Sequence, residues 1–163
     1  MFKVSGTPSW VKESFNKKGT TLRLRGNKSW VSQPVVDRVR VRLSDEISGV
    51  NVNRGMFAQF NVNGTKGRDK VIFGSQAGTI TKRFNSVINF KKDNVRDTFV
   101  FTNTTKEHGP FNHAQRIVIK NFGKEDRIVL KNIRKTFNFR DVRNDGSLPG
   151  VPVTSIRVDT INY

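Results

Sequence analysis

An arginine stands at every second position of the segment VDRVRVRL, residues 36–43, and this spacing is the strongest chemical signal in the sequence. If the segment is a β-strand, Arg38, Arg40 and Arg42 share one face and stand about 6.5–7 Å apart. That distance is close to the phosphate spacing of an extended single-stranded nucleic acid. Guanidinium groups also bind phosphate through two parallel hydrogen bonds. The segment therefore predicts a strand that contacts a phosphate polymer.

Two other interpretations of this arginine ladder remain open. Edge strands are often protected from pairing by charged side chains, so the ladder is also typical of a solvated edge. Alternatively, it could contact the acidic residues of a neighbouring subunit. The acids that would serve are Asp45, Glu46, Glu125 and Asp126. Lysine would protect an edge equally well, so the choice of arginine favours contact with phosphate.

The overall charge supports the same kind of partner. The chain has 163 residues, with 30 Lys plus Arg against 13 Asp plus Glu, and its net charge is +17. Magnitudes of about 2–8 are usual for a small domain. An excess of this size favours binding to polyanions, so we expect nucleic acid, contacted through its backbone phosphates, as the partner. The candidate nucleic-acid-binding residues are Arg23, Arg25, Arg38, Arg40, Arg42, Arg83, Arg134, Lys135 and Arg140.

Aromatic residues offer little for base stacking, which single-strand binders use. Most phenylalanines alternate with polar residues and are expected in the core. The remaining candidates are Trp10, Trp30 and Phe122. We expect the two tryptophans at an interface with another subunit or in the core, which leaves backbone contact as the main mode of binding.

The sequence gives little support for catalysis. His108 and His113 lie close to Glu107, a combination that can hold a metal ion. No cysteine and no further histidine completes such a site, and no glycine-rich segment matches a nucleotide-binding loop. We therefore predict no metal, no cofactor and no enzymatic activity.

Apolar residues alternate with polar residues through most of the chain, which is the pattern of strands with one buried face. Gly, Asn, Asp and Pro separate these runs. We expect an all-β fold, an antiparallel sandwich or barrel of jelly-roll-like form. Residues 121–124 would form a hairpin turn, and the glycines of residues 64–67 another.

Residues 1–34 are basic, carry both tryptophans and end at Pro34. They are expected to form an N-terminal arm with one short helix, which Thr7 would cap and Gly19 would end. Residues 35–163 would form a single β-sandwich domain. The chain has no cysteine, and its first residues lack the apolar stretch of a secretory signal. The longest apolar runs are too short to span a membrane, and no amphipathic helix indicates membrane binding.

These features together favour a non-enzymatic structural protein of a virus or phage particle. Such a protein would form a homo-oligomer or assemble with other particle proteins, contact the nucleic acid through its basic residues and be located in the virion. The alternative is a free single-strand-binding protein with an OB-like barrel, located inside the cell. A third and less favoured hypothesis is a nuclease on a β-scaffold that uses His108 or His113.

Overall fold

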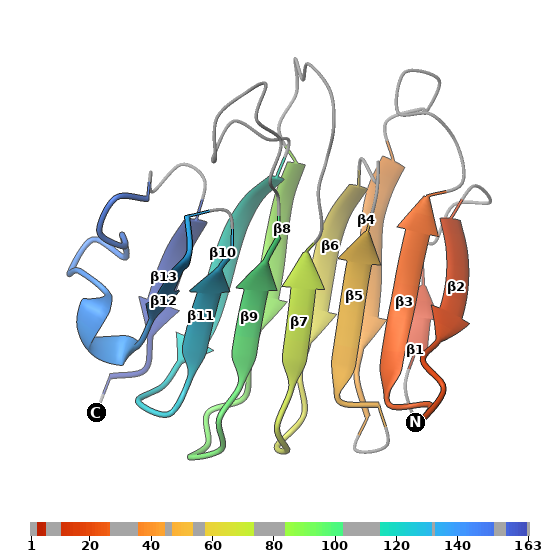
Figure 1. Ribbon diagram of the computed structural model, residues 1–163, viewed down its shortest axis with the longest axis horizontal. Helices are drawn as coiled ribbons and strands as arrows, with labels where there is room; N and C mark the ends of the chain where they lie inside the picture. The colour runs from red at the N-terminus through yellow and green to blue at the C-terminus, as the bar shows by residue number, and fades with distance from the viewer. Residues whose placement is uncertain are drawn as a thin grey trace.

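In the computed structural model, the regular structure of the described residues is almost entirely β-strand, and the strands lie in two sheets (Figure 1). A single turn of 3-10 helix, η3 (Phe139–Asp141), lies near the C-terminal end. The residues that the structure describes are 3–5, 11–26, 36–44, 47–53, 58–73, 84–102, 115–131, 133–151 and 156–162.

The two sheets have six and seven strands. Sheet A consists, in spatial order, of β1 (Lys3–Ser5), β4 (Val36–Arg42), β6 (Ala58–Asn63), β8 (Phe84–Asn89), β10 (Gln115–Phe122) and β13 (Ile156–Thr160). Sheet B consists of β12 (Lys135–Phe137), β11 (Arg127–Leu130), β9 (Thr98–Phe101), β7 (Lys70–Phe73), β5 (Gly49–Asn53), β3 (Thr21–Gly26) and β2 (Val11–Phe15).

From β3 to β11 the chain alternates between sheet B and sheet A, so that it winds as a flattened parallel β-solenoid. Neighbouring strands within each sheet are parallel through this region. The antiparallel pairs lie at the ends of the sheets, where β1 pairs with β4, β2 with β3 and β12 with β11. The expected antiparallel jelly-roll-like sandwich or barrel is therefore wrong.

The error has a physical cause. Strict alternation of apolar and polar residues shows that one face of a strand is buried, and this pattern is most familiar from antiparallel sheets. In the solenoid each sheet buries one face against the other sheet and exposes its other face to solvent. Apolar and polar residues therefore alternate along its parallel strands too. The expected hairpins at residues 64–67 and 121–124 are also wrong. Each segment leads from a strand of sheet A to a strand of sheet B, and not to a neighbouring strand of the same sheet.

One coil of the solenoid is a strand of sheet A together with the strand of sheet B that follows it in the chain. Apolar side chains of successive coils stack between the sheets. In sheet B, one stack runs through Val50, Val71, Phe99 and Ile128, which are paired in register and essentially inaccessible to solvent. In sheet A the corresponding stack is Val41, Val62, Ile88, Ile119 and Val158. Phe73 contacts both Phe60 and Phe99 edge to face, with ring centroids 5.7 Å apart.

The N-terminal segment contributes strands of both sheets. Residues 11–15, which the sequence predicts within a short helix, form strand β2, so that prediction is wrong. Gly19 does not end a helix; it has a positive φ of 68° in the turn between β2 and β3. β1 pairs with β4 and β3 pairs with β5, so these parts of the predicted arm extend the two sheets.

A stack of aspartates aligns the coils at one edge. Asp69, Asp97 and Asp126 each precede a sheet B strand, and they are 0%, 1% and 3% exposed. The Asp69 backbone N–H donates to Asp97 Oδ1 at 2.9 Å, and the Asp97 N–H donates to Asp126 Oδ1 at 2.8 Å. Each of these two carboxyl groups thus fixes the backbone of the preceding coil.

The parallel fold also bears on function. The expectation of a particle protein depends on a jelly-roll-like sandwich with a basic arm. The parallel solenoid removes that basis, and nothing in the structure supports a capsid protein or a location in the virion.

Candidate polyanion-binding face

The outer face of sheet A is polar and cationic. One row across the sheet pairs Arg40 with Asn61, and the next pairs Arg42 with Asn63. Farther along, β10 adds exposed cations to the same face. The exposed cations of this face are Arg40, Arg42, Arg116, Lys120 and Arg157.

Three of these five cations have no carboxylate partner in the described part of the chain. Among the described residues one ion pair is found, between Arg157 Nε and Asp159 Oδ1 at 3.2 Å. Arg40, Arg42 and Lys120 form no ion pair within that part of the chain. An anionic ligand would therefore meet charges that the fold leaves uncompensated.

The same face continues into three turns that lead from sheet A to sheet B. These basic turns, residues 64–69, 90–97 and 123–126, lie along the lower edge of the molecule in Figure 1. Their exposed cations are Lys66, Arg68, Lys91, Lys92, Arg96 and Lys124. Successive strands of a sheet are about 4.8 Å apart, so the turns place these cations close together along the edge.

Three acids of the basic turns, Asp69, Asp97 and Asp126, are buried, whereas Glu125 is exposed. Asp126 is buried, and its Oδ2 accepts the Gly123 N–H at 2.7 Å. Asp69 accepts from the Thr65 N–H at 2.6 Å and from the Thr65 hydroxyl at 3.0 Å. The fold thus uses these carboxyl groups to bind backbone amides, and the lysines and arginines of the same turns stay on the surface.

Burial further reduces the negative charge of the aspartate stack formed by Asp69, Asp97 and Asp126. Removal from water raises the pKa of Asp97 to about 8, an effect that the nearby Asp69, Asp126 and Asp93 reinforce and the Asp69 N–H opposes. Burial also raises the pKa of Asp126, against the opposing hydrogen bonds from Gly123 and Asp97. At neutral pH Asp97 is thus mainly uncharged, which leaves the cations of the basic turns with less compensation.

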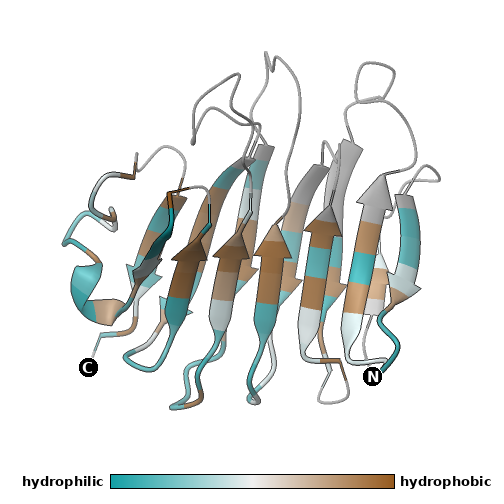
Figure 2. Cartoon of the chain, viewed as in Figure 1, coloured by the Kyte–Doolittle hydropathy of each residue, from teal (hydrophilic) through white to brown (hydrophobic). Residues whose placement is uncertain are grey.

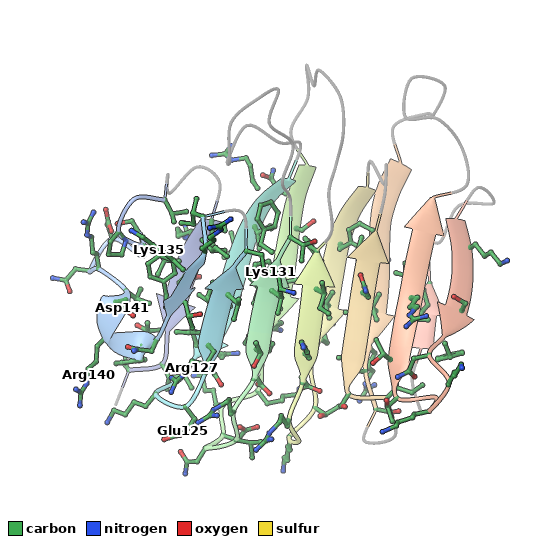
Figure 3. The ribbon with its side chains drawn as sticks, viewed as in Figure 1. Glu125, Arg127, Lys131, Lys135, Arg140 and Asp141 are labelled. Carbon is green, nitrogen blue, oxygen red and sulfur yellow. The ribbon has the colours of Figure 1, made fainter. Side chains whose placement is uncertain are left out.

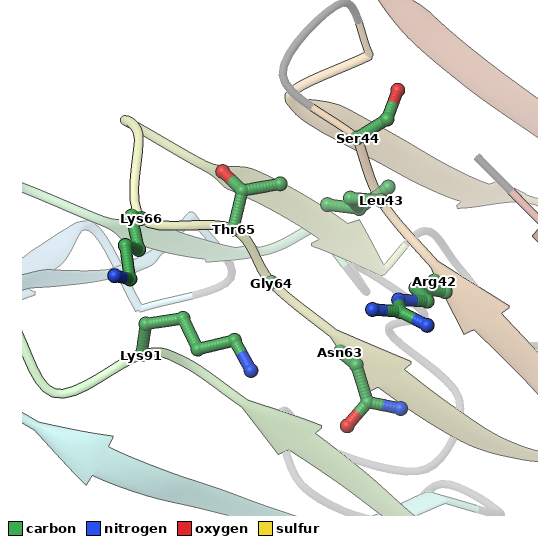
Figure 4. Close-up of a pocket in the computed structure, with 8 residues that line it drawn as sticks. All are labelled: Arg42, Leu43, Ser44, Asn63, Gly64, Thr65, Lys66 and Lys91. Carbon is green, nitrogen blue, oxygen red and sulfur yellow. The ribbon is translucent and has the colours of Figure 1, made fainter. Parts of the chain in front are cut away.

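A pocket of about 730 Å³ lies where the outer face of sheet A meets the basic turns (Figure 4). Arg42 reaches it from the end of β4 and Asn63 from the end of β6, while Lys66 and Lys91 come from two successive turns. Leu43, Ser44, Gly64 and Thr65 complete the lining. Three cationic side chains thus surround one space.

Gly64 is needed for the shape of this pocket. A Cβ at this position would lie 2.6 Å from Asp69 Oδ2, the atom that accepts the Thr65 N–H. We expect Gly64→Ala to lower the free energy of unfolding by about 1–3 kcal/mol, because the turn must open to admit the methyl group. Urea denaturation measures the effect.

Gly67→Ala is the matched control for this substitution, since its Cβ would meet no atom closer than 3.5 Å. Its free energy of unfolding should stay within about 0.5 kcal/mol of the wild-type value. Equal effects of the two substitutions would contradict the role assigned to Gly64.

The structure separates the predicted nucleic-acid contacts into three groups. Arg38, Arg40 and Arg42 belong to β4 of sheet A, and Arg40 and Arg42 are exposed. Arg23 and Arg25 belong to β3 of sheet B, so the two sets of arginines do not form one ladder.

The third group lies at the C-terminal end of the solenoid. Arg134 is in a turn with a φ of 54°, Lys135 is in β12 and Arg140 is in η3. Figure 3 shows Lys135 on β12 and Arg140 at the η3 turn, both far along the molecule from β4. Arg83, Trp10 and Trp30, as well as His108 and His113, lie outside the described residues.

Phe122 is not available for base stacking, because its side chain is fully buried. The candidate binding residues chosen from the sequence did not include Lys66, Lys91, Arg116 and Lys120. These cations come from different coils, and only the winding of the chain brings them onto the face that carries Arg40 and Arg42.

The outer face of sheet B is different in character. Ile72, Val100 and Val129 are paired in register there and form an apolar row. Figure 2 shows the upper parts of β7, β9 and β11, the strands that carry these residues, in brown. The exposed cations of this face, Lys12, Arg23 and Lys70, lie apart from this row. The face of sheet A is therefore the better match for a phosphate polymer.

Two other kinds of site find no support in the described part of the chain. It contains no group of three or more acidic or histidine side chains arranged to hold a metal ion. Nor does it contain a helix with the length and hydropathy of a membrane span.

Comparisons with known proteins give no match: no family model, no curated protein and no solved structure is significantly similar to this chain. Function must therefore be inferred from the fold and from the distribution of charge.

Proposed function

We propose that this protein is a non-enzymatic module that binds the backbone phosphates of nucleic acid. The binding surface is the outer face of sheet A together with the basic turns. The observation that carries this proposal is the segregation of charge in the turns, where the aspartates bind backbone amides in the interior and the cations face solvent.

Physical arguments support contact with the backbone over contact with bases. The described cations of this surface are spread over several strands and turns, which suits a polymer whose charges repeat regularly. Asparagines lie between them, at positions 61, 63 and 89, and can donate hydrogen bonds to phosphate oxygens. No described aromatic side chain lies on this face, whereas base-stacking binders use such groups.

The salt dependence of binding tests the proposal. We expect the affinity for a 20-nucleotide single strand to fall about 100-fold between 50 and 200 mM salt, as neutralisation of about five phosphates would require. Fluorescence anisotropy of a labelled oligonucleotide measures this, with a duplex of the same sequence in parallel. Affinity that changes less than threefold over this range, for both strand types, would rule out a backbone-phosphate binder.

Self-association remains a prediction from the sequence. A homo-oligomer would place several copies of the cationic face on one polymer and would increase the apparent affinity through multivalency. Light scattering with and without nucleic acid measures it.

A further inference from the structure

The pocket between Arg42, Asn63, Lys66 and Lys91 has the features of a site for one discrete anion. Figure 4 shows Lys66 and Lys91 side by side and the Arg42 guanidinium on the opposite side of the same space. These three cations form no ion pair or hydrogen bond with the described residues. Their mutual repulsion would be relieved by a bound anion.

A ladder of three amides determines what Asn63 presents to this pocket. Asn121 Nδ2 donates to the Phe90 carbonyl at 2.9 Å, and because a carbonyl can only accept, this bond fixes the orientation of the Asn121 amide. The same nitrogen donates to Asn89 Oδ1 at 3.2 Å, and Asn89 Nδ2 donates to Asn63 Oδ1 at 3.1 Å.

The orientation is thereby transmitted along the ladder to its last member. Asn63 Oδ1 accepts the hydrogen bond from Asn89, so the Nδ2 of Asn63 is the last group of the ladder. This NH₂ group has no partner among the described residues. In Figure 4 it lies on the side of Asn63 that is nearer to Arg42. The fold thus directs a fixed neutral donor, in addition to three cations, at the pocket.

We propose that this pocket binds one phosphate group. The proposal deepens the function proposed above, since it names the group that this part of the face recognises. Arg42 can donate two parallel hydrogen bonds to phosphate oxygens, Asn63 Nδ2 can donate one more, and Lys66 and Lys91 supply compact positive charge. No covalent step is involved.

Binding of inorganic phosphate tests this site without nucleic acid. We expect saturable shifts in the NMR signals of residues 63–66 and 91 of the full-length protein, with a dissociation constant in the millimolar range or lower. Asn63→Asp keeps the acceptor for Asn89 but replaces the donor in the pocket with a negative oxygen. It should weaken phosphate binding at least about 10-fold.

Asn85→Asp is the matched control, because it adds the same charge to an exposed position of the same sheet face, outside the pocket. It should change the dissociation constant for phosphate less than about threefold. Equal weakening by the two substitutions, or the absence of saturable shifts in the wild type, would overturn the proposal.

Two oligonucleotides, one with and one without a 5′-phosphate, distinguish the sources of the phosphate group. If the pocket holds a terminal phosphate, the phosphorylated strand binds more tightly and Asn63→Asp abolishes the difference. If it holds an internal phosphate, Asn63→Asp weakens both strands equally and more than Asn85→Asp does. If steeply salt-dependent binding of the strands is unaffected by Asn63→Asp, the pocket proposal fails and the general function stands.

Discussion

Replacing Asp97 with alanine is expected to lower the unfolding temperature by about 5–10 °C at pH 4, where the raised pKa of its carboxyl does not yet oppose folding. The substitution removes the acceptor of the Asp69 N–H, which leaves a buried donor without a partner, at a cost of about 1–3 kcal/mol, and it also leaves a small cavity. For a chain of this length, each kcal/mol corresponds to about 2–4 °C. Differential scanning calorimetry measures the change.

The pH dependence of stability provides a sharper test of the same residue. The pKa of Asp97 is about 8 in the folded protein, above the ordinary value of 3.8 that applies after unfolding. The folded state therefore holds a proton that the unfolded state releases. The stabilisation is complete below about pH 4, is lost as the pH rises towards 8 and does not change further above that. The slope contributed by this single group can reach about 1.4 kcal/mol per pH unit.

Asp97→Asn is the matched variant, because its amide oxygen can still accept the Asp69 N–H and its side chain does not titrate. The stability of this variant should depend much less on pH between 4 and 8, and the variant should exceed the wild type in stability at pH 9. Parallel stability curves for the two proteins would show that Asp97 does not carry a raised pKa.

Alternation of apolar and polar residues located many of the strands correctly. The strand expected at residues 36–43 is confirmed as β4, and other segments of alternating residues form β3, β6, β8 and β11. Their arrangement was wrong, because a period of two shows which face of a strand is buried but does not identify the neighbouring strand.

A signal for the correct winding was present in the sequence. An aspartate followed by one polar and then several apolar residues occurs three times, and the aspartates Asp69, Asp97 and Asp126 are separated by 28 and 29 positions. Internal repeats of 20–50 residues are typical of solenoids. The asparagines at positions 63, 89 and 121 form a second series, with spacings of 26 and 32. These asparagines are unequally spaced because the connections between coils differ in length, so the series is hard to recognise in the sequence.

The candidate site could be predicted only in part. Arg40 and Arg42 were found because their spacing lies within one strand. Lys66, Lys91 and Lys120 belong to other coils, and the sequence interpretation gave no register between coils. The contact between Asn63 and Asn89 also depends on that register, so the pocket could not have been predicted without it.

The second large expected effect concerns the choice of face. The variant Arg40→Gln, Arg42→Gln, Lys120→Gln removes three exposed cations from the outer face of sheet A. We expect its affinity for an oligonucleotide to fall at least about 10-fold at 100 mM salt, and its logarithmic salt slope to decrease in magnitude by about 2, since each lost phosphate contact removes about 0.7 from a single-strand slope. None of these side chains packs in the core, so the unfolding temperature should not change appreciably.

The decisive measurement compares this variant with one that loses the same charge from the opposite face, Lys12→Gln, Arg23→Gln, Lys70→Gln. Both proteins have a net charge three units below the wild-type value, so any difference between them reports position and not total charge. Anisotropy titrations across a salt series should show a large loss of affinity and a shallower slope for the sheet A variant, and less than a threefold loss for the sheet B variant. If the two variants lose affinity equally, the outer face of sheet A is not the nucleic-acid-binding surface.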